Sequence, residues 1–320
     1  LVFIGSSVAT LMFSIDQVAY LPQQYLLHSM ALLVLGPICY LFGAVFAKRS
    51  TSQQVNMMLT IALALASAFS GVVVLFPEMI STDEVTKGSY YQYAGDCLGI
   101  AALIGYARRD QRAPAWPILL AVPILILIGS RASLVAYVAA LMMSAMVLRL
   151  FLGMGVLIGV ILVFVKVSAD TLPDLYEMSR VVSTLAGALF DGAEDASLSE
   201  RMVFQQQALN VIAQQPITGS YGYDYFVGGY AHSALDLWAQ YGVVAFVAFV
   251  LAICANPCMN WMRRLFAGGT RRPDAPRYVP LLVYLIVQFA FFRHPESVVL
   301  FFGMGALSVL AQNHRLSPRR

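Results

Sequence analysis

One polar segment of this chain is associated with two residues that can do chemistry. One can bind an anion and the other can exchange a proton. Residues 169–231 are mostly polar and interrupt a sequence that otherwise consists of one apolar run after another. Arg201 lies inside this segment, and His232 follows it where the chain becomes apolar again. An imidazole exchanges a proton near neutral pH, and a guanidinium stays charged and binds anions. Placing ionisable groups beside apolar membrane spans costs free energy, so their presence indicates a functional site rather than a simple connecting loop.

A helix is predicted around Arg201. Ser197 and Glu200 have the spacing of a capping box, and apolar residues then recur with glutamines between them, which predicts an amphipathic helix lying on the bundle. Arg201 would lie in its first turn, where a cation opposes the helix dipole. An anionic partner therefore explains Arg201 better than helix stability does, although Glu200 or another loop carboxylate could be that partner.

Residues 216–230 are rich in glycine and aromatic side chains, which predicts turns with close backbone approach. Its tyrosines are candidates for stacking on sugar rings, although aromatic residues at a membrane surface also form an interfacial belt. The candidates are Tyr221, Tyr223 and Tyr225. A lone histidine such as His232 is more often structural than catalytic, so both interpretations stay open.

The composition sets the elements that must position these residues. Hydrophobic residues make up 59% and charged residues 12% of the chain, with a mean hydropathy of +0.73, whereas soluble domains carry about 25% charged residues. This predicts a polytopic membrane protein. The sequence begins at Leu1 inside an apolar run, without Met or a recognisable signal peptide, so we expect N-terminal spans to be missing.

Ten stretches reach or approach the roughly 20 apolar residues that cross a bilayer. They are residues 1–15, 26–47, 55–76, 91–107, 114–130, 132–148, 150–168, 232–252, 278–292 and 296–312. Backbone in lipid must satisfy its own hydrogen bonds and barrel-type alternation is absent, so we expect an all-α bundle of about ten spans. The predicted organisation is an N-terminal bundle (1–168), a large loop (169–231) and C-terminal helices (232–320).

Basic residues fix the orientation, since Lys and Arg in short loops stay cytoplasmic. Alternate connections hold 14 basic residues against 6 in the opposite set, which puts the large loop outside the cytoplasm. The net charge of +3 is then an asymmetry between faces and does not indicate nucleic-acid binding. Three arginines on the outer side besides Arg201 stand out: Arg131, Arg180 and Arg293. For Arg131, in a very short connection, the alternative is an anchor that reaches lipid headgroups.

Metal and disulfide chemistry find little support in the sequence. The four cysteines lie in or near apolar segments, so a disulfide framework is not expected. Cys254 and Cys258 have a ligand-like spacing, but no His or further Cys is near them, and membrane packing is the better interpretation. No Asp-x-Asp pattern, Gly-rich phosphate loop or nucleophile elbow is present, and we expect neither a metal nor a cofactor.

Several of these residues together resemble the O-antigen ligase and polymerase superfamily. In that family an Arg opens a periplasmic helix that ends in a Pro-x-x-Gly-x-Gly turn, and a His-Asn pair begins the next membrane helix, which continues to a Glu or Gln and a Gly. Arg201, residues 216–222 and residues 232–242 are similar to this pattern, and residues 130–134 are similar to a Ser-Arg-Gly-Ala-Leu segment. The resemblance is close over about 130–250.

The chain departs from the family pattern in three ways. Ser233 stands where Asn is common, Gln240 stands where Glu is common, and residues 232–242 are one residue shorter than expected. One missing residue turns a helix by about 100°. We therefore expect an irregular start to this helix.

The resemblance implies an inverting glycosyltransferase with a GT-C-like helical bundle in the bacterial inner membrane, acting at the periplasmic face. The donor would be a glycan on undecaprenyl diphosphate. The acceptor would be lipid A core for a ligase, or a second lipid-linked glycan for an O-antigen or exopolysaccharide polymerase.

The roles implied follow the chemistry of each group. His232 would accept the proton of the attacking hydroxyl, and Arg131 and Arg201 would bind the diphosphate, with Arg180 and Arg293 as further candidates. The competing class is a transporter of lipid-linked glycans, which would line its path with ionisable residues near the midplane. Asp96 and Lys166 are the main candidates for that role, and both are predicted to lie near helix ends.

Overall fold

The computed structural model of this chain describes residues 31–75, 84–108, 116–128, 130–142, 196–223, 231, 233–266, 277–291 and 297–316. Across these ranges the regular elements are helices and no strand occurs. The prediction of an all-α chain is thereby confirmed. The predicted spans 1–15 and 150–168 lie outside the described residues.

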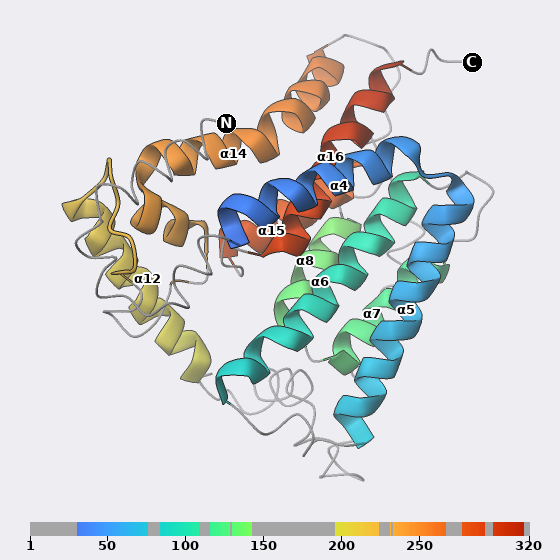
Figure 1. Ribbon diagram of the computed structural model, residues 1–320, viewed down its shortest axis with the longest axis horizontal. Helices are drawn as coiled ribbons and strands as arrows, with labels where there is room; N and C mark the ends of the chain where they lie inside the picture. Colours follow the sequence, from blue (N-terminus) through green and yellow to red (C-terminus); the bar gives the residue numbers. More distant parts are fainter. Residues whose placement is uncertain are drawn as a thin grey trace. The chain divides into compact units, whose positions relative to one another are not determined.

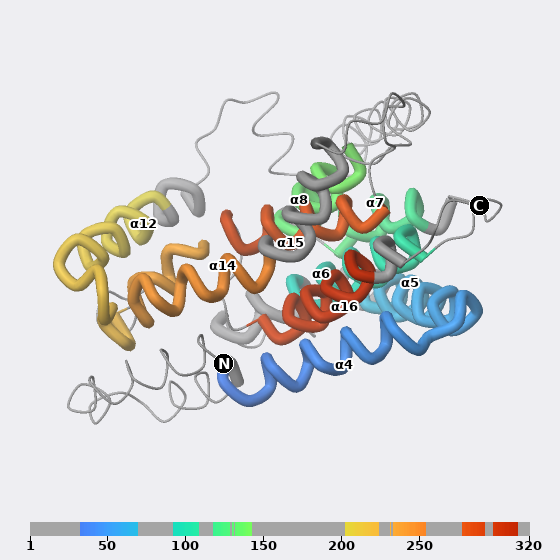
Figure 2. Tube along the Cα trace, turned by 90° about the horizontal axis from the view of Figure 1, so that it is seen from above, coloured from blue at the N-terminus to red at the C-terminus, as the bar shows by residue number. Residues whose placement is uncertain are grey.

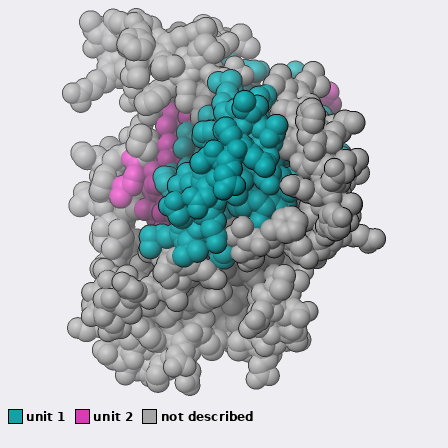
Figure 3. All heavy atoms as spheres, turned by 90° about the vertical axis from the view of Figure 1, so that its left-hand side faces the viewer, with its two compact units in different colours: residues 1–48, 195–270, 285–320 teal, residues 49–194, 271–284 magenta. Residues whose placement is uncertain are grey.

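The chain divides into two compact units, each assembled from segments distant in sequence. Unit 1 comprises residues 1–48, 195–270 and 285–320, and unit 2 comprises residues 49–194 and 271–284 (Figure 3). These units are defined by packing. The predicted segments 1–168, 169–231 and 232–320 describe membrane topology, which is a different division of the chain.

Four helices of unit 2 follow one another along the chain. They are α5 (Ser52–Leu75), α6 (Glu84–Arg108), α7 (Trp116–Ile128) and α8 (Arg131–Met142), and α6 packs against each of the other three (Figure 1). α6 begins at Glu84 although its apolar run begins only near residue 91. Hydropathy marks the apolar part of a helix and not its ends, so the polar first turns were missed.

A local signal sets the start of α5. Thr51 and Gln54 form a reciprocal capping box, in which the Thr51 amide donates to Gln54 Oε1 at 2.8 Å and the Gln54 amide donates to Thr51 Oγ1 at 3.3 Å. These bonds satisfy amides that the first helical turn leaves without partners.

Unit 1 contains a π-helical turn η1 (Ala31–Leu35) that continues into α4 (Gly36–Arg49), followed by α12 (Ala196–Gln214), α14 (Ala234–Phe266) and α16 (Val298–Leu316). The remaining helix α15 (Val279–Phe291) is divided between the units at residue 284. Within unit 1, α14 contacts both α12 and α16.

α4 and α16 lie side by side with their backbones in contact (Figures 1 and 2). A Cβ built on Gly43 would come within 2.0 Å of the Phe302 carbonyl oxygen, and one on Gly305 within 1.8 Å of the Tyr40 carbonyl oxygen. Only glycine fits at both positions. Phe46 of α4 packs on Phe302 of α16 at a ring-centroid distance of 5.9 Å. Four other large apolar side chains of α4 are 41–66% exposed, namely Ile38, Leu41, Phe42 and Val45.

One described helix region is long and apolar enough to cross a membrane, namely residues Ala234–Ile253 of α14. Four shorter apolar helices of 10–17 residues occur as well, at Ile118–Ile128, Ala132–Met142, Val279–Phe291 and Val298–Gln312.

Candidate functional site

The start of α14 is interrupted at Gly242. This residue has φ 77° and ψ 174°, a conformation that is not helical and that L side chains rarely adopt. Residues 234–241 therefore form a short helix before the long one. The irregularity predicted from the missing residue exists, but it lies at Gly242 and not at the first turn.

The turn after α12 docks into this break. In a continuous helix the Val243 amide would donate to the Ala239 carbonyl; here it donates to the Pro216 carbonyl at 3.0 Å. The Ala239 carbonyl instead accepts from the Ser220 amide at 2.7 Å. The turn thus supplies a partner to each of these two backbone groups, which would otherwise have paired with each other.

Two glycines make the contact possible. A Cβ on Gly219 would lie 2.5 Å from the Gly242 nitrogen, and one on Gly242 would lie 1.9 Å from the Ile217 oxygen. Trp238 adds a side-chain bond, because its indole N–H donates to the Pro216 carbonyl at 2.9 Å. The glycines of residues 216–222 are therefore required by the close approach of two backbones.

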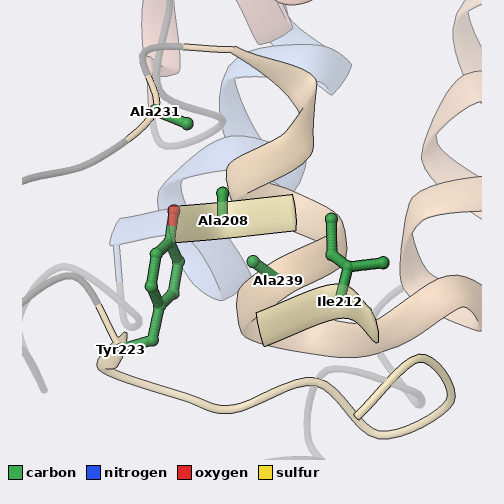
Figure 4. Close-up of a cluster of buried hydrophobic side chains, with 5 residues drawn as sticks. All are labelled: Ala208, Ile212, Tyr223, Ala231 and Ala239. Carbon is green, nitrogen blue, oxygen red and sulfur yellow. The ribbon is translucent and has the colours of Figure 1, made fainter. Parts of the chain in front are cut away.

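A small buried cluster holds α12 against the same region. It consists of Ala208, Ile212, Tyr223, Ala231 and Ala239, which come from α12, the turn, the segment before α14, and α14 itself (Figure 4). Arg201 precedes Ala208 by seven residues, two turns of helix, so its backbone position has the register of this packed face.

The helix around Arg201 differs from the prediction in its start. α12 begins at Ala196, so Ser197 lies inside the helix rather than at its cap. Arg201 falls in the second turn, where the helix dipole opposes a cation less. The helix dipole therefore gives little reason to expect an anionic partner for Arg201.

Asp236, four residues after His232 in sequence, is fully buried. Its Oδ1 accepts from the Tyr223 hydroxyl and from the Ala231 amide at 2.8 Å, and its Oδ2 accepts from the Ser233 amide at 3.4 Å. Residues 231 and 233 flank His232. The backbone on both sides of the histidine is therefore fixed to one carboxylate.

A comparable arrangement occurs in unit 2 at the start of α8, where Arg131 is the first residue. Asp96 is fully buried, and its Oδ1 accepts from the Ser133 hydroxyl and from the Tyr284 hydroxyl, each at 2.8 Å. The Ser130 hydroxyl donates to Ser133 Oγ at 2.7 Å. The two serines that bracket Arg131 are thus tied to a buried aspartate.

The prediction that Asp96 lies near a helix end needs correction. α6 extends from Glu84 to Arg108, so Asp96 stands at its middle. Its partner Ser133 is in the first turn of α8. Asp96 is therefore central along α6 but level with the end of the neighbouring helix.

The tyrosines expected to bind substrate take other roles. Tyr221 is 1% exposed and packs at a ring-centroid distance of 5.7 Å from Tyr241, and Tyr223 is 3% exposed and bonded to Asp236. Neither ring face is accessible for stacking on a sugar, so we assign both tyrosines to the core of unit 1. Four further candidates, Arg180, Tyr225, His232 and Arg293, lie outside the described residues.

Sequence reasoning considered Asp96 only as a transport residue and missed Asp236. A signal for Asp236 existed, because Ser233 and Asp236 have the Ser-x-x-Asp spacing of a capping box. Ser233 Oγ indeed accepts from the Leu235 amide at 3.3 Å. Ser233 thereby serves as a helix cap.

Comparison with known proteins adds no assignment: no protein family matches the chain, and no similar curated protein is found. Among the described side chains, no group of three or more His, Cys, Asp or Glu residues could hold a metal ion.

Proposed function

We propose that this chain is an inner-membrane glycosyltransferase like the O-antigen ligases, which moves a glycan from undecaprenyl diphosphate to a hydroxyl of lipid A core at the periplasmic face. The observation that carries the proposal is the junction of α12 with the start of α14. Residues 216–222 lock into the break at Gly242, and Asp236 fixes the backbone around His232. Two parts of the family resemblance, residues 216–222 and the start of α14, are thereby connected within unit 1.

The packing of α4 supports a membrane location, which the proposal extends to a bundle of about ten spans. Its buried positions are small, namely Gly36, Gly43 and Ala47, whereas four of its large apolar side chains are 41–66% exposed. Helices in lipid pack through small residues because the surrounding acyl chains are as apolar as leucine. A water-soluble bundle would bury the large residues instead.

The proposed reaction is a direct displacement at the anomeric carbon. The acceptor hydroxyl attacks this carbon and transfers its proton to the His232 imidazole, while the bond to the diphosphate oxygen breaks and undecaprenyl diphosphate leaves. Arg201 and Arg131 stabilise the negative charge that grows on the leaving group. One displacement inverts the anomeric configuration. The diphosphate is a good leaving group, so no strong general acid is required.

The reaction is proposed to be independent of metal ions because the sequence lacks the Asp-x-Asp pattern that metal-dependent enzymes of this kind often use. Treatment of the purified protein with EDTA should leave transfer unchanged. Loss of transfer that a divalent ion restores would contradict this part of the proposal.

The decisive experiment is reconstitution of the purified chain in liposomes with a lipid-linked glycan and two competing acceptors, lipid A core and a second lipid-linked glycan. Glycosylated lipid A core supports the ligase, and elongated lipid-linked glycan supports the alternative, a polymerase of the same superfamily. A His232→Ala variant should insert and fold but transfer nothing. His294→Ala serves as the matched control and should keep full activity.

A second candidate is a transporter of lipid-linked glycans, which buried Asp96 in the middle of α6 favours. A transporter would move the glycan lipid across the liposome membrane without forming a glycosidic bond. Movement of the glycan lipid across the membrane without a glycosylated product would therefore support the transporter. The serine and tyrosine bonds of Asp96 favour a structural role instead, because they tie helices together rather than line a path.

A further inference from the structure

Asp236 makes more contacts than a helix cap requires. Capping accounts for one oxygen, because a Ser-x-x-Asp box needs only the bond from the Ser233 amide to Oδ2. Oδ1 takes the Tyr223 hydroxyl and the Ala231 amide in addition, and the side chain is 0% exposed. Burying a carboxylate is costly, and an exposed one would cap the helix equally well.

Of the two additional contacts, one reaches a chain neighbour of His232 and the other reaches the docked turn. Ala231 and Ser233 are the two chain neighbours of His232, and Tyr223 directly follows Gly222 at the end of the turn that docks into α14. One carboxylate therefore connects the turn, the segment before α14 and the first turn of α14. The residues on either side of position 232 are thereby held by the same side chain.

We propose that Asp236 is a positioning residue for His232 and that the Tyr223 hydroxyl holds Asp236 in place. This inference rests on the proposed function, in which His232 receives the acceptor proton. A base must stand within hydrogen-bond reach of the proton it takes, and small misplacements lower the rate by large factors. Loss of Asp236 should thus slow the chemical step and leave donor binding unchanged.

The test compares Asp236→Ala, Asp236→Asn and Tyr223→Phe in the liposome assay. We expect Asp236→Ala to lower kcat about 100-fold with the donor KM within about twofold of wild type. The Asn variant keeps an oxygen for Tyr223 and Ala231 and should retain activity within about tenfold of wild type, the rescue that a merely electrostatic role would not give. The kcat of Tyr223→Phe should lie between those of the two Asp236 variants.

A control separates positioning from helix capping. Ser233→Ala removes the cap oxygen that Leu235 uses but leaves every Asp236 contact in place. It should lower the melting temperature as much as Asp236→Asn does and lower kcat less than Asp236→Ala does. Equal losses of kcat in Ser233→Ala and Asp236→Ala would overturn the proposal in favour of capping alone.

A double-mutant cycle shows whether Asp236 acts through the histidine. In a His232→Ala background, Asp236→Ala should cause no further loss of transfer, because the residue it positions is gone. A further loss as large as that in the wild-type background would overturn the proposal.

An NMR measurement that does not depend on glycan transfer tests this proposal separately from the proposed function. His28, His294 and His314 are replaced by Gln, which leaves His232 as the single histidine, and its imidazole is followed by NMR with ¹⁵N-labelled histidine. We expect one sharp set of signals with Asp236 and several broadened sets in Asp236→Ala and, if that variant does not fold, in Tyr223→Phe. Unchanged signals in a folded variant overturn the positioning role. If the wild type transfers no glycan, the proposed function fails, and these spectra still decide the role of Asp236.

Discussion

Gly242 is a single residue whose conformation decides how two segments meet. Its φ is 77°, and a Cβ built on it would lie 1.9 Å from the Ile217 carbonyl oxygen. Neither feature permits another residue type without movement of the chain. Gly219 opposes it, so the pair acts as one contact between the turn and α14.

Gly242→Ala should therefore destabilise unit 1. Strain at a positive φ costs about 1–3 kcal/mol, and the clash with the Ile217 carbonyl adds to it. We expect a lower midpoint of denaturant unfolding for the purified protein in detergent. Gly105→Ala is the matched control, since its Cβ would meet only the tip of the Leu59 side chain at 3.2 Å. A Gly242 variant as stable as the Gly105 variant would contradict this account of the contact.

Arg201 offers a second test at the residue scale. Arg201→Lys keeps the charge but removes the planar fork that binds two phosphate oxygens. Loss of one charge-assisted hydrogen bond, about 1.5–3 kcal/mol, predicts a roughly 10- to 100-fold lower transfer rate. The control is Arg49→Lys at the exposed end of α4, which should leave transfer unchanged. Full activity of the Arg201 variant would reduce this arginine to a membrane anchor.

At the scale of elements, buried polar groups and small residues set which helices meet. Asp96 joins α6 to α8 through Ser133 and to α15 through Tyr284, which lie 37 and 188 residues from it in sequence. Gly95 permits this approach, because a Cβ there would come within 2.7 Å of Ser130. The position of Arg131 at the start of α8 thus depends on contacts with two other helices.

Asp96→Ala should destabilise unit 2 and impair transfer through α8. The change removes an acceptor from two buried hydroxyl donors, at a cost of about 1–3 kcal/mol for each. Limited proteolysis and thermal unfolding in detergent measure the loss. Asp96→Asn, which keeps one acceptor oxygen, should lose less, and equal losses in both variants would show that the charge and not the hydrogen bonds matters.

The contact of α4 with α16 makes a separate prediction. Gly43→Ala places a methyl group 2.0 Å from the Phe302 carbonyl oxygen and should force the two helices apart. We expect a lower melting temperature in detergent. Val45 lies on the same helix and is 50% exposed, so Val45→Ala should change the melting temperature little. A larger effect at Val45 than at Gly43 would contradict the arrangement of small residues inward and large ones outward.

At the scale of the whole molecule, the distribution of basic residues predicts which connections face the cytoplasm. Thr51 lies in a connection with Lys48 and Arg49, whereas Ile217 lies in the turn after α12 and is 69% exposed. The proposed orientation puts Thr51 inside and Ile217 outside the cytoplasm.

Single cysteines at these two positions test the orientation. In a variant without the four native cysteines, Ile217→Cys should react with a membrane-impermeant maleimide in spheroplasts, and Thr51→Cys should react only after the membrane is disrupted. The reverse labelling would invert the topology and remove the proposed site from the periplasm. Labelling of both without disruption would contradict the membrane proposal.

The sequence by itself determined the helical class and the approximate places of the described apolar helices, because the periodicity and length of apolar runs are local properties. It also determined that the turn of residues 216–222 needs glycine. It could not locate the break at Gly242, which exists because backbone groups of the turn replace those of the helix.

Only the tertiary structure decided what Tyr221, Tyr223, Asp96 and Asp236 do. Aromatic residues near a membrane suit a sugar site, an interfacial belt or a core equally well by type, and burial alone separates these roles. The two aspartates acquire their roles from hydroxyl groups and amides far apart in sequence. Such pairings follow from how helices pack, a property that no local pattern of residues encodes.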